Sequence, residues 1–170
     1  LSRRKNVDVL IYAFKLIKRR NPLAELYIIG DGPMNYRLKT IANPIGGVRF
    51  LGSLPNAEVK RLLREEINVL VLPSRFETFG LCVLEAMVYG VPVVVTPVGD
   101  FPHVLRDTET CLFTKTDNPF DLARKIEALF DEELAKKISE NARVFVERNH
   151  AEEKIIDRYV SLYQRLLDRQ

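Results

Sequence analysis

The feature that most constrains the fold of this chain is an alternation of short apolar runs with stretches of helical period. The apolar runs are rich in β-branched or aromatic residues, and most of them end at Gly, Pro or Ser. This composition is typical of strands that are buried on both faces, because helices then cover the sheet on either side. The predicted strands cover residues 26–29, 48–51, 69–72, 91–95 and 110–113.

The stretches between these runs have the period of an amphipathic helix. In the first of them, Val7, Leu10, Phe14 and Ile17 recur at steps of three or four residues. Such an alternation of strands and helices favours an α/β fold with a doubly wound parallel sheet, helices on both faces and ligands at the carboxyl ends of the strands. Helices are predicted over residues 7–18, 33–42, 56–64, 79–89 and 121–130.

Two further helices are predicted nearer the C-terminus, over residues 134–148 and 151–167. The second of these carries a continuous apolar stripe on one face. Two interpretations stay open: the stripe packs on the surface of this domain, or it reaches across to a second domain outside the 170 residues. The stripe consists of Ile156, Tyr159, Val160, Tyr163, Leu166 and Leu167.

The charge and the cysteines of the sequence indicate which partners and which compartment to expect. The 26 Lys and Arg residues outnumber the 23 Asp and Glu residues by only three, which is too little to indicate a polyanionic partner. The basic cluster at Arg3, Arg4 and Lys5 has no interleaved aromatic residues, so we expect no nucleic-acid partner. Because Cys82 and Cys111 both lie in apolar segments, we expect buried, reduced thiols in a cytoplasmic protein; contact with a membrane surface stays open.

The segment from residue 74 to residue 93 has the features of a ligand site. A predicted strand ends just before Ser74, and Gly80 begins a predicted helix. A helix N-terminus at the carboxyl end of a strand offers unpaired N–H groups, here those of Phe79, Gly80 and Leu81, to an anionic or hydroxyl-rich ligand. Gly80 also lets a ligand approach the backbone closely.

Two carboxylates accompany these N–H groups. Glu85 is the only ionisable acid or base in a helix that is otherwise apolar on nearly every side, and an unpaired buried carboxylate costs several kcal/mol. Its side chain must therefore reach solvent, a cation or a ligand with hydroxyl groups. Glu77 lies in the preceding loop. Together they suit a polyhydroxyl ligand with two ends, although each could also be an ordinary solvated residue.

This segment resembles the signature of the retaining family 4 glycosyltransferases of the GT-B fold. The resemblance rests on Glu77 and Glu85, separated by seven residues and set in Phe-Glu-Thr-Phe-Gly-Leu and Glu-Ala-Met, followed by Gly-Val-Pro-Val. Three further motifs occur in the family's order and extend the similarity over nearly the whole chain. They are the Gly-Asp-Gly-Pro turn at residues 30–33, Phe-Leu-Gly at residues 50–52 and Leu-Pro-Ser at residues 72–74.

The resemblance implies the C-terminal, Rossmann-like half of a two-domain enzyme, which binds the nucleotide-sugar donor. Glu85 would accept hydrogen bonds from the ribose, and Glu77, with the N–H groups of residues 79–81, would hold the transferred sugar and the diphosphate. The base would lie near Gly30 and Gly52. Lys5 falls on the family's Gly-Arg-Leu-x-x-x-Lys-Gly motif, in which the lysine pairs with the leaving diphosphate. Glu77 and Lys5 are thus the expected catalytic residues, with no metal and no cofactor besides the donor.

Four residues depart from the family pattern. Asp100 and His103 occur in a loop where the family usually has Gly-Gly-x-Pro-Glu-Val, and Thr108 and Cys111 replace glycines. The family's loop faces the donor pocket, so these departures put its usual diphosphate and sugar contacts in doubt. We expect His103 to be a loop residue without a catalytic role.

The implied activity is the transfer of a hexose, with mannose as the first candidate, and with retention of configuration. The acceptor would be a sugar, a lipid-linked sugar or another glycoconjugate, held by an N-terminal domain of the same enzyme. We expect residues 1–150 to form the donor domain, with its first strand cropped before Leu1, and residues 151–170 to form a helix that can cross to the other domain. The isolated domain should not catalyse transfer. A nucleotide-sugar epimerase of the GT-B fold and a non-catalytic binding domain are the alternatives.

Overall fold

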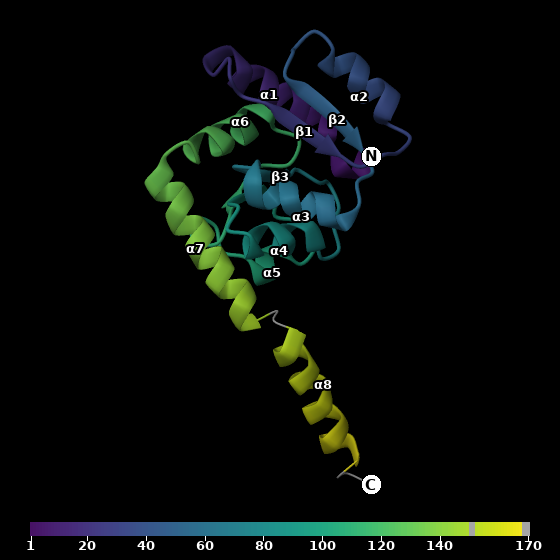
Figure 1. Ribbon diagram of the computed structural model, residues 1–170, viewed down its shortest axis with the longest axis vertical. Helices are drawn as coiled ribbons and strands as arrows, with labels where there is room; N and C mark the ends of the chain where they lie inside the picture. Colours follow the sequence, from purple (N-terminus) through teal and green to yellow (C-terminus); the bar gives the residue numbers. More distant parts are fainter. Residues whose placement is uncertain (150–151, 168–170) are drawn as a thin grey trace.

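The chain folds into an α/β domain with helices on both sides of parallel strands (Figure 1). A computed structural model describes residues 1–149 and 152–167. Every predicted strand and helix is present within a few residues of its predicted bounds. The elements are η1 (Arg3–Lys5), α1 (Val7–Arg20), β1 (Leu26–Ile29), α2 (Asn35–Ala42), β2 (Val48–Gly52), α3 (Asn56–Glu65), β3 (Leu70–Leu72), α4 (Leu81–Val88), β4 (Val93–Val95), α5 (Phe101–Val104), β5 (Leu112–Phe113), α6 (Pro119–Ala128), α7 (Glu132–Asn149) and α8 (Glu152–Leu167).

The strands form two parallel sheets. In the first sheet β1 pairs with β2, and Leu26 lies opposite Val48. In the second sheet β4 lies between β3 and β5, with Leu70 opposite Val93 and Val94 opposite Leu112. The parallel pairing confirms the predicted fold class, but among the described residues no strand joins β1 to β3.

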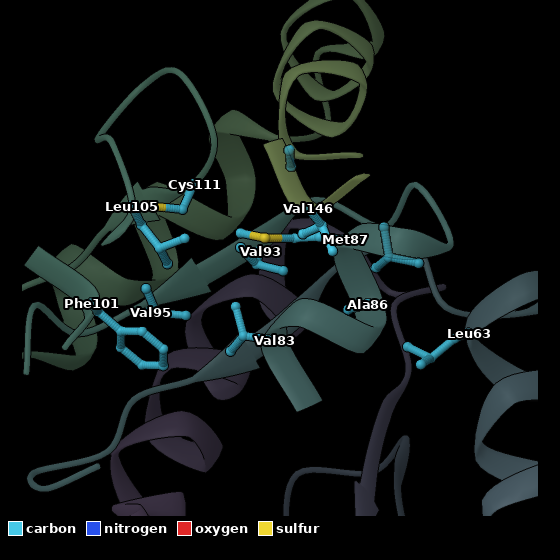
Figure 2. Close-up of a cluster of buried hydrophobic side chains, with 12 residues drawn as sticks. Leu63, Val83, Ala86, Met87, Val93, Val95, Phe101, Leu105, Cys111 and Val146 are labelled. Atoms are coloured by element: carbon cyan, nitrogen blue, oxygen red, sulfur yellow. The ribbon is translucent and has the colours of Figure 1, made fainter. Parts of the chain in front are cut away.

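Strand β4 is the centre of the core. All three of its valines are buried, and their side chains alternate between the two faces of the sheet. Val93 and Val95 pack in one cluster with Met87 of α4 and Val146 of α7, as Figure 2 shows. Val94 belongs to a second cluster on the other face, formed mainly with α1, α6 and α7. The two clusters confirm the predicted layers of helices.

The last two helices differ in how they are buried. Helix α7 buries Ile138, Ala142 and Val146 against the domain. Helix α8 extends away from the domain in Figure 1, and every side chain described in it, including Ile156 and Leu166, is exposed. The apolar stripe of α8 is therefore not covered by this domain in the structure. Contact of the stripe with a second domain stays a prediction.

The two cysteines also differ in burial. Cys111 is buried, and this burial raises the pKa of its thiol to about 12. Cys82 is exposed, so the prediction that both thiols are buried is wrong for this residue. Cys82 is the second residue of α4 and lines a groove between the two sheets, whereas Val83 beside it faces the core. Within the described ranges, no helix is long and apolar enough to span a bilayer.

Candidate functional site

An ion pair between Lys5 and Glu77 is the centre of the candidate site. Lys5 Nζ donates to Glu77 Oε2 at 2.6 Å, although the two residues are 72 positions apart in the sequence. The Glu77 side chain is only 11% exposed, against 42% for Lys5. The Ser74 hydroxyl at 3.5 Å and the Thr78 N–H at 3.3 Å also donate to this carboxylate. A carboxylate with so little exposure needs such partners, because leaving it unpaired is costly.

Asn6 brings Lys5 to this position. Its backbone is left-handed, with φ 55° and ψ 34°, where η1 ends and α1 begins. Its fully buried side chain donates from Nδ2 to the carbonyl oxygen of Pro73 at 3.0 Å. The N–H of Arg75 donates to the Arg4 carbonyl oxygen at 2.7 Å and adds a second tie. The N-terminal segment is thereby fastened to the carboxyl end of β3.

The loop that carries Glu77 packs tightly against the loop after β4. Gly80 has φ +62° and precedes the first residue of α4, and a Cβ atom there would overlap the ring of Phe101. Gly99 has φ +59°, and a Cβ atom there would overlap the carbonyl oxygen of Glu77. The N–H of Asp100 donates to the Thr78 carbonyl oxygen at 3.3 Å. These contacts fix the backbone around Glu77 and the start of α4.

Helix α4 begins at Leu81, two residues later than predicted, and Gly80 is the residue directly before it. Leu81 is 67% exposed, and no side chain caps the helix. The first N–H groups of an uncapped helix, together with the positive end of its dipole, favour an anion. The backbone N–H groups that the sequence predicts as ligand donors, those of residues 79–81, therefore lie at a helix end that is exposed to solvent.

Glu85 follows Leu81 by four residues in α4, which is slightly more than one helical turn. It is half-buried, and its carboxylate has no hydrogen bond or ion pair within residues 1–149 and 152–167. It lines the groove between β1 and β3 together with Cys82.

Gly30 and Gly52 lie side by side at the carboxyl end of the first sheet. The N–H of Gly30 donates to the Gly52 carbonyl oxygen at 2.6 Å. Asp31 accepts hydrogen bonds from the Gly32 N–H at 2.7 Å and from the Asn35 amide at 2.8 Å. These two hydrogen bonds, that of Gly32 foremost, hold the pKa of Asp31 below its usual value. Both turns lie at strand ends, where ligands bind in open parallel sheets.

The four departures from the family pattern lie in two turns. Asp100 and His103 are exposed, and His103 is the third residue of the short helix α5. Thr108 keeps a left-handed backbone, with φ 63°, although glycine is the usual residue in that conformation. Cys111 is buried, and its carbonyl oxygen accepts from the Thr108 N–H at 2.8 Å. The turn at residues 107–111 is thus retained without glycine.

Sequence reasoning missed three parts of the site. Ser74 and Gly99 support Glu77 through contacts that periodicity does not report, and the bond from Asn6 to Pro73 joins residues 67 positions apart, which no local pattern indicates. A cavity of about 260 Å³, lined in part by Arg3, Arg37 and Arg75, was also not predicted. No group of three or more His, Cys, Asp or Glu side chains in the described part of the chain could hold a metal ion.

The sequence resembles known enzymes over almost its whole length. Residues 1–145 match the family described as glycosyl transferases group 1. N-acetyl-alpha-D-glucosaminyl L-malate synthase of Bacillus anthracis is 33% identical over 167 residues, which cover 96% of this chain and 43% of that enzyme. The chain spans less than half the length of the curated relatives that it matches.

Solved structures have the same fold. The C-terminal domain of a group 1 glycosyl transferase family protein from Francisella tularensis has a TM-score of 0.81 at 22% identity, over 89% of this chain and 83% of that chain. HepE of Anabaena, solved in complex with UDP and glucose, has a TM-score of 0.84 at 21% identity, over 96% of this chain and 46% of that chain.

Proposed function

Since the chain belongs to the glycosyl transferases group 1, we propose that it is the donor-binding domain of an enzyme that transfers a hexose from a nucleotide sugar. The observation that carries the proposal is the Lys5–Glu77 ion pair beside the open N-terminus of α4. This arrangement places a cation, a carboxylate and a helix N-terminus without a side-chain cap at one strand end. A donor with a diphosphate and a sugar needs all three.

Lys5 and α4 act on the diphosphate. When the bond between the sugar and the phosphate breaks, the leaving diphosphate gains negative charge, which a lysine and a helix N-terminus stabilise. In the structure Lys5 is neutralised by Glu77 at 2.6 Å. Donor binding therefore shares or replaces this ion pair, and the released Glu77 carboxylate is then available to the hydroxyl groups of the sugar.

Glu85 acts on the ribose. It is half-buried, and its carboxylate has no hydrogen-bond or ion-pair partner in the described residues, so the lone pairs of the carboxylate are available to a ligand with hydroxyl groups. The base lies at the joined turns of Gly30 and Gly52, on the neighbouring sheet. The UDP in the Anabaena structure supports a nucleotide donor of this kind.

We propose that transfer retains the configuration of the sugar. The acceptor oxygen bonds to the anomeric carbon on the face from which the diphosphate departs, and the acceptor proton goes to the leaving diphosphate oxygen. The acceptor is a sugar, a lipid-linked sugar or another glycoconjugate, held by an N-terminal domain outside residues 1–170. Mannose is the first donor sugar to test, and no metal takes part in the step.

The test uses a longer protein that contains this domain, assayed with GDP-mannose, UDP-glucose and UDP-N-acetylglucosamine and a panel of acceptors. Replacing Glu77 by Gln removes the charge that Lys5 and the sugar require, and we expect transfer to fall by about 100-fold or more. Glu85→Gln weakens ribose binding, and we expect the donor KM to rise about tenfold. Anomeric proton NMR of the product tests retention.

Glu109→Gln is the matched control, because Glu109 is exposed in a loop and forms no ion pair in the described part of the chain. Its rate should equal that of the unmodified protein. Unchanged transfer by both site variants would contradict the assignment of the site. Conversion of the donor sugar without an acceptor would instead show an epimerase, and absence of donor binding at millimolar concentration would show a non-catalytic domain.

A further inference from the structure

A cavity of about 260 Å³ lies where the N-terminal segment meets the beginning of α2 and the residues that follow β3. Three of its eight lining residues are arginines, Arg3, Arg37 and Arg75, and one is acidic, Asp8. Since Arg3 and Arg75 are 72 positions apart, the fold gathers these arginines, and not a local basic run. A cavity with this lining has a surplus of positive charge, which favours an anionic group.

Hydrogen bonds hold the three segments of the cavity together. The Met34 N–H donates to the Leu1 carbonyl oxygen at 3.1 Å. Arg75 donates from Nη1 to the Arg3 carbonyl oxygen at 3.3 Å and from Nε to Asp117 Oδ1 at 2.7 Å. The Arg75 guanidinium is therefore oriented by two partners before a ligand binds, which lowers the entropic cost of binding.

The other two arginines have no counter-ion among the described residues. Neither the Arg3 nor the Arg37 side chain forms a hydrogen bond or an ion pair within residues 1–149 and 152–167, and both are exposed. By contrast, Arg20 and Arg49, which lie elsewhere on the surface, each pair with a glutamate at 2.7 Å. The N–H donors of Arg3 and Arg37 are therefore available to a ligand.

Two helices begin at the cavity. Val7 is the first residue of α1, Met34 directly precedes the first residue of α2, and both line the cavity. The two helices contact one another and lie side by side in Figure 1. In the described part of the chain, no side chain caps the N-terminus of either helix. The positive ends of both helix dipoles thus add to the attraction of the arginines for an anion.

The remaining lining residues indicate what else the ligand carries. Asp8 lines the cavity, yet its carboxylate has no hydrogen bond or ion pair with the described residues. An ionised carboxylate only accepts hydrogen bonds, so it suits a ligand with hydroxyl groups. Val7, Met34 and Leu38 offer an apolar surface to the carbon atoms of such a ligand.

The cavity is separate from the proposed donor site. Lys5, Glu77 and Glu85 do not line it, and neither do residues 79–81. Lys5 is bonded to Glu77 at 2.6 Å, whereas Arg3, two residues earlier, lines the cavity. The N-terminal segment therefore supplies cations to two different places.

We propose that this cavity, the arginine pocket formed by Arg3, Arg37, Arg75 and Asp8, binds the phosphate monoester of a small hydroxylated compound. The three guanidinium groups donate charge-assisted hydrogen bonds to the phosphate oxygens, which their forked geometry matches. Asp8 accepts a hydrogen bond from a hydroxyl group of the same compound. The arginine pocket is a site in addition to the donor site, and this inference does not depend on the proposed activity.

The test titrates the 170-residue chain with glycerol 3-phosphate and follows NMR signals. The reporters are the backbone amides of Val7, Asp8 and Met34 and the side-chain Nε–H groups of Arg3 and Arg37. We expect these signals to shift and to saturate at millimolar concentration. Inorganic phosphate, which lacks the hydroxylated carbon part, should bind about tenfold more weakly. Glycerol alone should not bind.

Substitutions in the arginine pocket test the assignment of its residues. Arg3→Gln and Arg37→Gln should each weaken the binding of glycerol 3-phosphate by about tenfold or more, because each removes a charged donor. Asp8→Ala should bind inorganic phosphate more tightly and lose the preference for glycerol 3-phosphate. Arg19→Gln is the matched control, since Arg19 is an exposed arginine of α1 that does not line the cavity. Its binding should be unchanged.

Three results would overturn the proposal. The first is that neither glycerol 3-phosphate nor inorganic phosphate binds at millimolar concentration. The second is an equal loss of binding in Arg19→Gln and Arg37→Gln, which would show attraction to surface charge in general. The third is a set of shifts confined to Lys5 and residues 79–81, which would place the phosphate in the donor site.

A vesicle experiment distinguishes a soluble ester from a lipid head group. Phosphatidylcholine vesicles that contain phosphatidic acid present a glycerol phosphate monoester on a membrane surface. We expect binding of soluble glycerol 3-phosphate without cosedimentation of the chain with these vesicles, which assigns the pocket to a soluble compound. Cosedimentation that Arg37→Gln abolishes and Arg19→Gln retains would assign it to a head group. Both results support a phosphate-ester site at these arginines.

Discussion

At the scale of single residues, three described positions other than glycine have a left-handed backbone: Asn6, Thr108 and Asp117. Asn6 has φ 55° and Thr108 has φ 63°. Asparagine tolerates this conformation, and here its buried side chain also donates to Pro73, which glycine could not do. Thr108 is a β-branched residue, for which a positive φ is a genuine outlier. The Asn6 side chain thus joins the N-terminal segment of the site to the end of β3.

Gly99 supports the site through its lack of a side chain. Its φ is +59°, and a Cβ atom there would overlap the Glu77 carbonyl oxygen. We expect Gly99→Ala to lower the free energy of unfolding by the backbone strain, about 1–2 kcal/mol, and by a further ~1–3 kcal/mol for the overlap. Urea denaturation measures both effects.

Gly90→Ala is the matched control. Gly90 has φ +72°, but nothing lies within 4 Å of a Cβ atom built there. Only the backbone strain should contribute in this variant, so its free energy of unfolding should fall by about 1–2 kcal/mol. Equal losses in the two variants would show that the loop around Glu77 yields to the added methyl group.

At the scale of elements, the junction between β5 and α6 is held by one buried carboxylate. Asp121 accepts from the Lys115 N–H at 2.9 Å, the Thr114 hydroxyl at 3.2 Å and Arg124 at 2.5 Å. Its own N–H donates to Asn118, which caps α6. Burial raises the pKa of Asp121, but the hydrogen bonds from Arg124, Lys115 and Thr114 outweigh it, and the pKa is lowered.

This lowered pKa makes the stability of the junction depend on pH. Asp121→Asn should cost about 1–3 kcal/mol at pH 7, because buried donors lose their charged acceptor. The contribution of the carboxylate is complete above the unfolded pKa of about 3.9 and is lost as the pH falls through the lower folded value. Urea denaturation at pH 7, 5 and 3.5 should therefore show a difference from the unmodified chain that shrinks only at the lowest pH.

The exposed Glu109 provides the comparison for this prediction. Glu109→Gln should change the free energy of unfolding by less than about 0.5 kcal/mol at each pH. A loss for Asp121→Asn that is the same at pH 3.5 as at pH 7 would show that the charge of Asp121 does not contribute.

At the scale of the whole molecule, the stability of the domain is expected to come from residues 1–149. Ile138 of α7 is fully buried between the sheet and α6, whereas Ile156 of α8 is 52% exposed. We expect Ile138→Ala to cost about 2–4 kcal/mol, which corresponds to a fall of roughly 5–15 °C in Tm. Ile156→Ala should lower the Tm by less than about 2 °C.

Differential scanning calorimetry measures both variants, and a chain that ends at residue 149 extends the comparison. Its Tm should lie within about 2 °C of that of the full chain, since none of the side chains described in α8 is buried. A large fall in Tm on removal of α8 would show that its apolar stripe is covered by the domain in solution.

Much of the fold could be predicted, because the local pattern of apolar and polar residues determines where strands and helices form. The doubly buried run at residues 93–95 and the helical period of α1 report which faces each element buries. Helix α5 has only four residues and escaped prediction, since one turn is too short to show a period. Cys82 was wrongly predicted to be buried, because the surrounding residues are apolar while the groove beside it exposes its own face of α4.

By itself, the sequence determined the order of strands and helices, the approximate start of α4 next to Gly80, and the residue types available for chemistry. Only the tertiary structure decided which of these residues meet. The pairing of Lys5 with Glu77 spans 72 positions and depends on the left-handed Asn6 and its bond to Pro73. The groove between β1 and β3 likewise follows from strand pairing, which is a contact between distant segments. The hydrophobic periodicity of the sequence indicates whether a residue is buried, but it does not indicate which distant residues are packed against it.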